Sequence, residues 1–216
     1  MASADLIPAR PVRQRLLDAA ERLFAEHGWG VSIRTIAAAA EVSLAALNYH
    51  FGPKENLLAE IFAARARPIA AERMRLLHEI EAGGHPTLEA VITAFLRPAL
   101  AVGVEDRFGG KVFVKLRARL AAEPEAFSRR ILADAFDESG RHYLAALQRL
   151  LPDLPRVELY WRFHFLLGTM VYTMADAGRI QSLTKGACDP GDPEAALRRI
   201  VPFLAAGFRS PAPDAA

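Results

Sequence analysis

The chain has 216 residues, of which 52% are hydrophobic and 24% charged; this composition excludes extensive disorder and suffices for a substantial buried core. Its formal net charge is +2, from 27 Lys and Arg against 25 Asp and Glu, so bulk charge gives no argument for a nucleic-acid partner. The single cysteine, Cys188, excludes an internal disulfide, and without an apolar signal run near its start we expect a cytoplasmic protein.

The first quarter of the chain is predicted to form three helices. Apolar residues at helical spacing indicate the first over 11–27, and closely spaced glycines end it. Ser32 and Ser43 each suit the N-cap of a short helix, and these two helices are expected over 33–40 and 44–51.

A longer fourth helix is predicted to begin at Lys54 and to end before Gly83, with a kink at Pro68. Five further helices are expected over 88–100, 111–122, 123–150, 156–177 and 193–206, the first of them capped by Thr87. No run alternates apolar and polar residues as a strand does, and the predicted fold class is therefore all-α.

The stretch 32–54 has the pattern of a helix-turn-helix that docks on DNA. Such a motif needs a positioning helix, a tight turn, and a second helix whose outward side chains reach base edges in the major groove. Ile36, Leu47 and Phe51 supply part of the apolar interior, and small alanines let the helices approach. The residues expected to contact DNA are Ser32, Arg34, Ser43, Leu44, Ala45, Asn48, Tyr49, His50 and Lys54.

Within this set, phosphate contacts favour hydroxyl and cationic side chains. Those residues are Ser32, Arg34, Tyr49 and Lys54. Base reading favours small and polar side chains on the second helix, because the groove admits the helix only if they are modest in size. Leu44 or Ala45 suits a thymine methyl. Asn48 or His50 suits a hydrogen bond to a base edge.

These assignments have structural alternatives. Tyr49 and His50 also suit packing against the first helix. Arg34 and Lys54 also suit ordinary solvated positions. Because pairs of Ser-capped short helices occur in proteins that never meet DNA, an all-α ligand-binding or interaction protein remains an open alternative.

Four segments of the N-terminal region resemble the DNA-binding domain of the TetR family. They are E-R-L-F-A-E-H-G-W, S-I-R-T-I-A, V-S-L-A-A-L-N-Y-H-F and K-E-N-L-L, which cover about residues 12–62 in the family's order and spacing. The resemblance implies an all-α homodimer that binds operator DNA through its first domain and a small effector through its second.

The family pattern can be transferred to this sequence residue by residue. The phosphate contacts and base-facing positions that it implies agree with those assigned above from side-chain chemistry. The implied phosphate contacts are Ser32, Tyr49 and Lys54, and the implied base-facing positions are Ser43, Leu44, Ala45 and His50. Many members have an aromatic residue directly after the recognition-helix leucine, where this chain has Asn48, so the role of that position is open.

The predicted helix over 156–177 is apolar nearly all round, so both of its sides must be covered. We expect one side to pack on its own domain and the other on a second copy of the chain, together with the last helix. The residues expected at this dimer interface are Val157, Trp161, His164, Gly168, Val171, Leu197, Ile200, Val201 and Leu204.

The C-terminal half has more aromatic side chains than a tight helical bundle needs, which favours an apolar effector pocket with a few polar anchors. Lys115, Arg117 or His164 is the expected partner of an acidic head group. The full expected lining is Phe95, Phe113, Lys115, Arg117, Phe127, Phe136, Trp161, His164, Phe165 and Tyr172. The alternative is that the aromatics are plain core and the cations solvated.

Three short patches in this half also resemble the fatty-acid-responsive branch of the TetR family. They are L-Y-W-R-F-H-F-L-L-G, V-F-V-K-L and I-V-P-F-L-A-A-G. This resemblance implies a fatty acid or acyl thioester as the effector, with a drug-like ligand as the alternative.

The expected organisation is a DNA-binding domain over 10–55 and an effector-binding and dimerisation domain over 56–209, flanked by disordered tails over 1–9 and 210–216. No phosphate loop, nucleophile elbow or metal-ligand spacing is present in the sequence, so we expect neither an enzyme nor a bound metal or cofactor. No apolar run has the length of a membrane span, and no membrane partner is expected.

Overall fold

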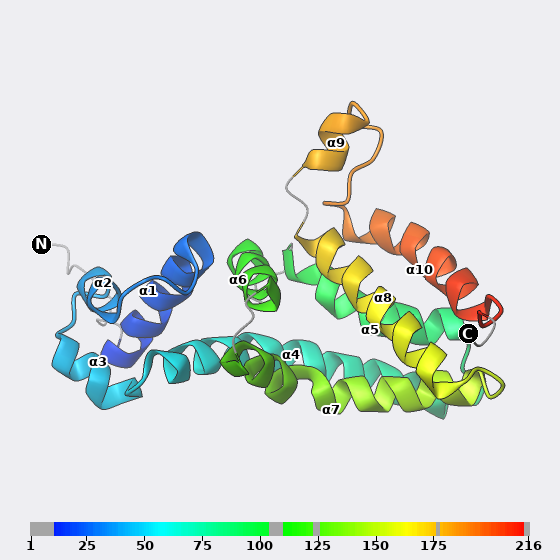
Figure 1. The fold of residues 1–216 in the computed structure, drawn as a ribbon, viewed down its shortest axis with the longest axis horizontal. Coiled ribbons are helices and arrows are strands. Elements are labelled where there is room, and N and C mark those ends of the chain that lie inside the picture. Colours follow the sequence, from blue (N-terminus) through cyan, green and yellow to red (C-terminus); the bar gives the residue numbers. More distant parts are fainter. Residues whose placement is uncertain (1–10, 104–109, 123–125, 176–177, 214–216) are drawn as a thin grey trace, which may run out of the picture. The chain divides into compact units, whose positions relative to one another are not determined.

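A computed structural model describes residues 11–103, 110–122, 126–175 and 178–213. Over these residues every regular element is a helix, which confirms the all-α prediction (Figure 1). The chain divides into two units, one ending at Phe62 and the other beginning at Ala63. The helix α4 (Lys54–Ala82) begins in the first unit and ends in the second.

The first unit is formed by α1 (Val12–His27), α2 (Ile33–Ala39), α3 (Leu44–Phe51) and the start of α4. The predicted helices agree with these bounds to within one residue at each end. Large apolar side chains from all four helices are buried between them. The largest are Leu16, Phe24, Ile36, Leu47, Leu57 and Phe62.

The second unit is a bundle centred on α5 (Leu88–Leu100), nine of whose 13 residues are buried. This helix packs against three long helices, α7 (Ala126–Leu150), α8 (Arg156–Met174) and α10 (Pro193–Arg209). The remaining elements are the 3-10 turn η1 (Ala101–Gly103), α6 (Gly110–Ala122) and the short α9 (Arg179–Leu183).

The structure departs from the predicted helices at three places in this unit. The helix α8 ends at Met174 rather than at 177, and α10 continues to Arg209 rather than ending at 206. The helix α9 was not predicted, because five residues with no buried side chain leave no apolar periodicity to detect. Pro68 lies inside α4, which is a single helix across that residue.

The predicted tails lie partly outside the described residues, which exclude 1–10 and 214–216. Ser210 is the C-cap of α10, and Arg162 donates hydrogen bonds to the carbonyl oxygens of Phe208 (2.7 Å) and Pro211 (3.2 Å). The chain is thus held to α8 for a short distance past the end of its last helix. Among the described residues, no helix is long and apolar enough to cross a membrane.

Candidate nucleic-acid interface and effector site

The starts of α2 and α3 are each fixed by a hydrogen bond to a serine side chain. Ser32 Oγ accepts a hydrogen bond from the N–H of Thr35, and Ser43 Oγ accepts one from the N–H of Ala46, each at 3.1 Å. Both serines are therefore the predicted N-caps. Between the two helices Glu41 has φ +54°, a left-handed conformation that reverses the chain direction tightly.

The recognition helix α3 is attached to its unit on one side. Leu47 and Phe51 are buried, as predicted. Arg15 donates a hydrogen bond to the carbonyl oxygen of Glu41 in the turn (2.6 Å), and Asn56 Nδ2 donates one to the carbonyl oxygen of Phe51 at the end of α3 (3.1 Å). Sequence reasoning missed both polar contacts, because an isolated arginine or asparagine carries no periodic signal.

The opposite side of α3 is open. Tyr49 is 86% exposed, and its ring meets the neighbouring His50 ring edge-on at 5.4 Å. Because both rings project outward, the alternative that they pack against the first helix is wrong. Of the other expected DNA-contacting residues, Leu44 is half-buried and the exposed ones are Ser32, Arg34, Ser43, Ala45 and Asn48.

Lys54 at the start of α4 contacts the segment between α1 and α2. Its Nζ donates hydrogen bonds to the carbonyl oxygens of Trp29 and Val31, the second at 3.0 Å, and lies 3.9 Å from the centroid of the Trp29 ring. Partial burial lowers the pKa of Lys54. The alternative that Lys54 is an ordinary solvated charge is wrong, because two of its three donors are engaged within the unit.

In the second unit, two buried arginines meet at one aromatic ring. Arg73 of α4 and Arg117 of α6 are 1% and 6% exposed, and their guanidinium carbons lie 5.7 and 4.8 Å from the centroid of Phe136 on α7. Arg73 also lies 3.7 Å from the Phe95 ring centroid, and the hydroxyl of Tyr143 donates a hydrogen bond to the Arg73 carbonyl oxygen (2.8 Å).

Among the described residues, no carboxylate forms a salt bridge with either arginine of this cluster. Burial lowers the pKa of Arg73 to about 9, with a further contribution from the charge of Arg117. Burial alone lowers the pKa of Arg117 to about 10. Arg73 was not predicted as a site residue, since an arginine in a long helix is usually solvated.

The structure separates the ten residues expected around the effector into two groups. Phe95, Arg117 and the half-buried Phe136 belong to the arginine cluster, while Phe113 is buried on the same helix as Arg117 and Phe127 is half-buried on α7. The structure does not bring the other five to this cluster. Lys115 is exposed on α6, and the exposed residues of α8 are Trp161, His164, Phe165 and Tyr172.

The exposed residues of α8 form an apolar stripe along its outer side. Val157 is 64% and Trp161 54% exposed, and the Trp161 and Phe165 rings stack at 6.0 Å. On α10, Phe203 is 71% exposed, a residue that sequence reasoning missed. We call the exposed large apolar residues of these two helices the α8–α10 face; they are Val157, Tyr160, Trp161, Phe165, Tyr172 and Phe203.

The residues expected at the dimer interface differ in exposure. His164 and Gly168 are exposed beside the α8–α10 face, and a Cβ added to Gly168 would meet nothing within 4 Å. Leu197 and Leu204 are instead buried in the core of their own unit, because they lie on the side of α10 that packs on α5 and α8. Those half-buried against the core are Val171, Ile200 and Val201.

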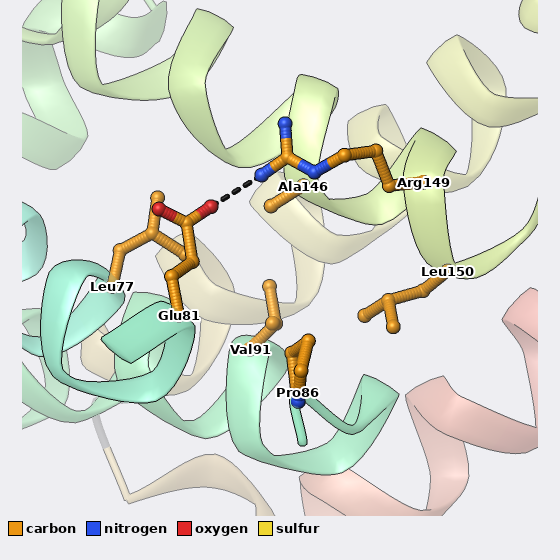
Figure 2. A pocket seen from close by; sticks show the side chains of 7 residues that line it. All are labelled: Leu77, Glu81, Pro86, Val91, Ala146, Arg149 and Leu150. Atoms are coloured by element: carbon orange, nitrogen blue, oxygen red, sulfur yellow. Dashed lines mark hydrogen bonds and ion pairs between the residues drawn. The ribbon is translucent and has the colours of Figure 1, made fainter. Parts of the chain in front are cut away.

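A half-open cavity of about 340 Å³ lies elsewhere in the second unit, where α4, α5 and α7 meet. Figure 2 shows Glu81 and Arg149 paired at this cavity. The apolar lining is Leu77, Pro86, Val91, Ala146 and Leu150. None of the residues expected around the effector lines this cavity.

Comparison with known protein families shows to which family this all-α architecture belongs. Residues 16–61 match the family model of bacterial regulatory proteins of the tetR family, and residues 93–207, more than half of the chain, match that of the tetracyclin repressor-like C-terminal domain. The chain belongs to the TetR family. The predicted resemblance to the TetR family is thereby confirmed.

Curated relatives match part of this TetR-family chain. One is the HTH-type transcriptional repressor AcnR of Corynebacterium glutamicum, 43% identical over 68 residues, which are 31% of this chain and 34% of the relative. The match thus spans about a third of the relative's length.

Two solved structures share the fold over nearly the whole TetR-family chain. The regulator PfmR of Thermus thermophilus has a TM-score of 0.62 at 20% identity and covers 93% of this chain and 97% of its own. FadR of Bacillus subtilis, solved in complex with stearoyl-CoA, has a TM-score of 0.57 at 16% identity and covers 90% and 98%. At these identities the likeness concerns the fold.

A metal centre has no support in the described part of this TetR-family protein, where no group of three His, Cys, Asp or Glu side chains is placed to hold an ion. The two candidate sites among the described residues are the exposed side of α3 and the buried arginine cluster of the second unit.

Proposed function

We propose that the protein is a dimeric transcriptional repressor of the cytoplasm that binds operator DNA through α3 and releases it when a small apolar effector binds the second unit. The observation that carries the proposal is the division of α3 into a buried side, with Leu47 and Phe51, and an exposed side of small and polar residues. An exposed helix face of this kind fits the major groove.

The proposed roles of the DNA-contacting residues follow from their exposure. Ser32, Arg34 and Tyr49 contact phosphates, since their hydroxyl or guanidinium groups lie at the ends and outer surface of the motif. Ala45, Asn48 and His50 face base edges, with Ser43 and Leu44 at the start of the same helix. Lys54 supports the motif through its two carbonyl partners, and its remaining donor is the one proposed for a phosphate.

Dimerisation is proposed through the α8–α10 face. Large contiguous apolar surfaces are uncommon on monomers, and aromatic residues are enriched at interfaces. Gly168 lies on the same side of α8, where the lack of a side chain permits close approach of a second backbone. A twofold dimer presents two copies of α3 to two half-sites of an operator.

The proposed effector is a fatty acid or an acyl thioester. Two observations support it: the buried arginine cluster among aromatic side chains, and the fold shared with the FadR protein that was solved with stearoyl-CoA. An effector lowers operator affinity only through a difference in its affinity for the DNA-competent and incompetent states, typically about 1–3 kcal/mol.

The decisive experiment is binding of the purified protein to a labelled fragment of the DNA upstream of its own gene, followed by fluorescence anisotropy. We expect salt-dependent, sequence-selective binding that weakens when acyl ligands are added. Absence of selective binding at low salt to upstream fragments would contradict the DNA-binding proposal. Equal operator affinity with and without every acyl ligand would contradict only the effector.

A further inference from the structure

The arginine cluster places two cationic groups where water does not reach them. Arg73 and Arg117 come from different helices, α4 and α6, yet both guanidinium groups lie against the Phe136 ring and away from solvent. Arginine side chains are almost never fully buried unless they are paired. The cluster therefore requires an account of what compensates its charge.

The hydrogen-bond partners that the described residues offer the two guanidinium groups are neutral. Arg73 Nε donates to the Phe95 carbonyl oxygen (2.8 Å) and Nη2 to Met170 Sδ (3.2 Å), while Arg117 Nη1 faces Met174 Sδ at 3.7 Å. Thioether sulfur is a weak acceptor. Within the described ranges, neither arginine forms a salt bridge with a carboxylate.

Both groups nevertheless remain cationic at neutral pH. The lowered pKa values, about 9 for Arg73 and about 10 for Arg117, are still above 7. Two neighbouring positive charges in a medium of low dielectric constant repel one another and lack hydration. A bound anion removes both costs, so the site is suited to a negatively charged group.

We propose that Arg73 and Arg117 together bind the carboxylate of a free fatty acid, whose chain lies among Phe95, Phe136 and the neighbouring Phe113. This rests on the effector-responsive function proposed above and names the ligand's chemical class. Two planar guanidinium forks match a carboxylate in shape and charge. An acyl thioester carries no charge at its carbonyl group, so that group does not offer the two guanidinium groups an anion.

Matched ligands test the carboxylate directly. Isothermal titration calorimetry at neutral pH compares saturated acids from octanoate to stearate with the primary alcohols and coenzyme A thioesters of equal chain length. We expect the best acid to bind at least about tenfold more tightly than its alcohol and its thioester, the ratio that one charge-assisted contact provides. Equal affinity of acid and alcohol, or no binding of any acid, overturns the proposal.

Variants on α6 separate a ligand site from a structural role. Arg117→Met removes the charge at similar length and is expected to abolish the preference for acid over alcohol, whereas Arg117→Lys retains part of it. Lys111→Met, exposed on the same helix, leaves the preference unchanged. An unchanged preference in Arg117→Met overturns the proposal.

The ligand-free stability of the same variants provides the second readout. Replacing a buried, uncompensated charge by an apolar side chain of similar size often stabilises a protein, so Tm of ligand-free Arg117→Met is expected to rise by about 2 °C or more. A purely structural arginine predicts a lower Tm, and that result overturns the proposal.

Operator binding measured on the same samples keeps the two proposals apart. Acid preference without operator binding contradicts the proposed repressor function and leaves the carboxylate site standing. Operator binding by wild-type protein that shows no acid preference contradicts the carboxylate site alone.

Discussion

Two helices present exposed faces of opposite chemistry. The outer side of α3 carries small and polar side chains such as Ser43, Ala45 and Asn48, while that of α8 carries large apolar ones such as Trp161 and Phe165. Polar edges of a hydrated groove suit the first, and an apolar partner suits the second. The comparison shows that an exposed helix face does not by itself indicate what binds there. The chemistry of its exposed side chains indicates the kind of partner.

The largest effect is expected from placing charge on the α8–α10 face. In Trp161→Asp with Phe165→Asp, two carboxylates would have to be buried for the dimer to form, so we expect monomers in sedimentation velocity and at least about 100-fold weaker operator binding. Arg130→Glu, exposed on α7, is the charge-changing control and should remain dimeric. A dimer in the double variant means that the face is not the interface.

The next effect concerns base reading by α3. His50→Ala and Asn48→Ala remove exposed hydrogen-bonding groups and are each expected to cost about 1–3 kcal/mol on the preferred operator, with relaxed preference at one base position. Competition binding against a library of operator variants measures this. Because the side chains do not support the core, Tm should stay constant; uniform weakening on all sequences argues against a base-reading role.

A smaller and sequence-independent effect is expected at Tyr49. Tyr49→Phe removes one hydroxyl from an exposed ring and should weaken specific and nonspecific DNA alike, several-fold or less, because phosphate contacts carry no sequence information. Anisotropy titrations on operator and scrambled duplexes measure the ratio of the two affinities. A changed ratio would move Tyr49 from the phosphate-contacting to the base-reading residues.

The smallest effect is a pH dependence of stability from the arginine cluster. Burial lowers the folded-state pKa of Arg73 to about 9 and that of Arg117 to about 10, below the ordinary values that both groups have in the unfolded chain. As the pH rises toward these values, the folded state releases protons that the unfolded state keeps, so the cost of the two buried charges in the wild type declines. The Tm advantage of Arg117→Met over wild type should therefore shrink between pH 8 and 10. Differential scanning calorimetry measures it, and a constant difference contradicts a buried-charge origin.

The comparison between α3 and α8 also shows when the spacing of apolar residues predicts the buried side of a helix and when it does not. On α3 the outward set was predicted correctly as exposed, apart from the half-buried Leu44, because Leu47 and Phe51 are its only large apolar anchors. On α8 large apolar residues occur on every side, so periodicity does not choose the inner one. The pocket and interface predictions consequently overlapped at Trp161 and His164.

The amino-acid sequence by itself determined the helical class, the helix ends of the first unit and the helix-turn-helix. These depend on local physics: serine caps, glycine and proline breaks, and helical periodicity act within a few residues. These features can therefore be predicted without knowledge of the tertiary structure.

Only the tertiary structure decided which cations are internal and which side of α8 is inner. Lys54 reaches carbonyl groups more than twenty residues earlier, and Arg73 meets Arg117 from another helix. Such pairings depend on how distant segments pack, and burial changes the energy of a charge far more than its neighbours in sequence do. The proposed carboxylate site is formed only when α4, α6 and α7 pack together, so it could not be predicted from the sequence.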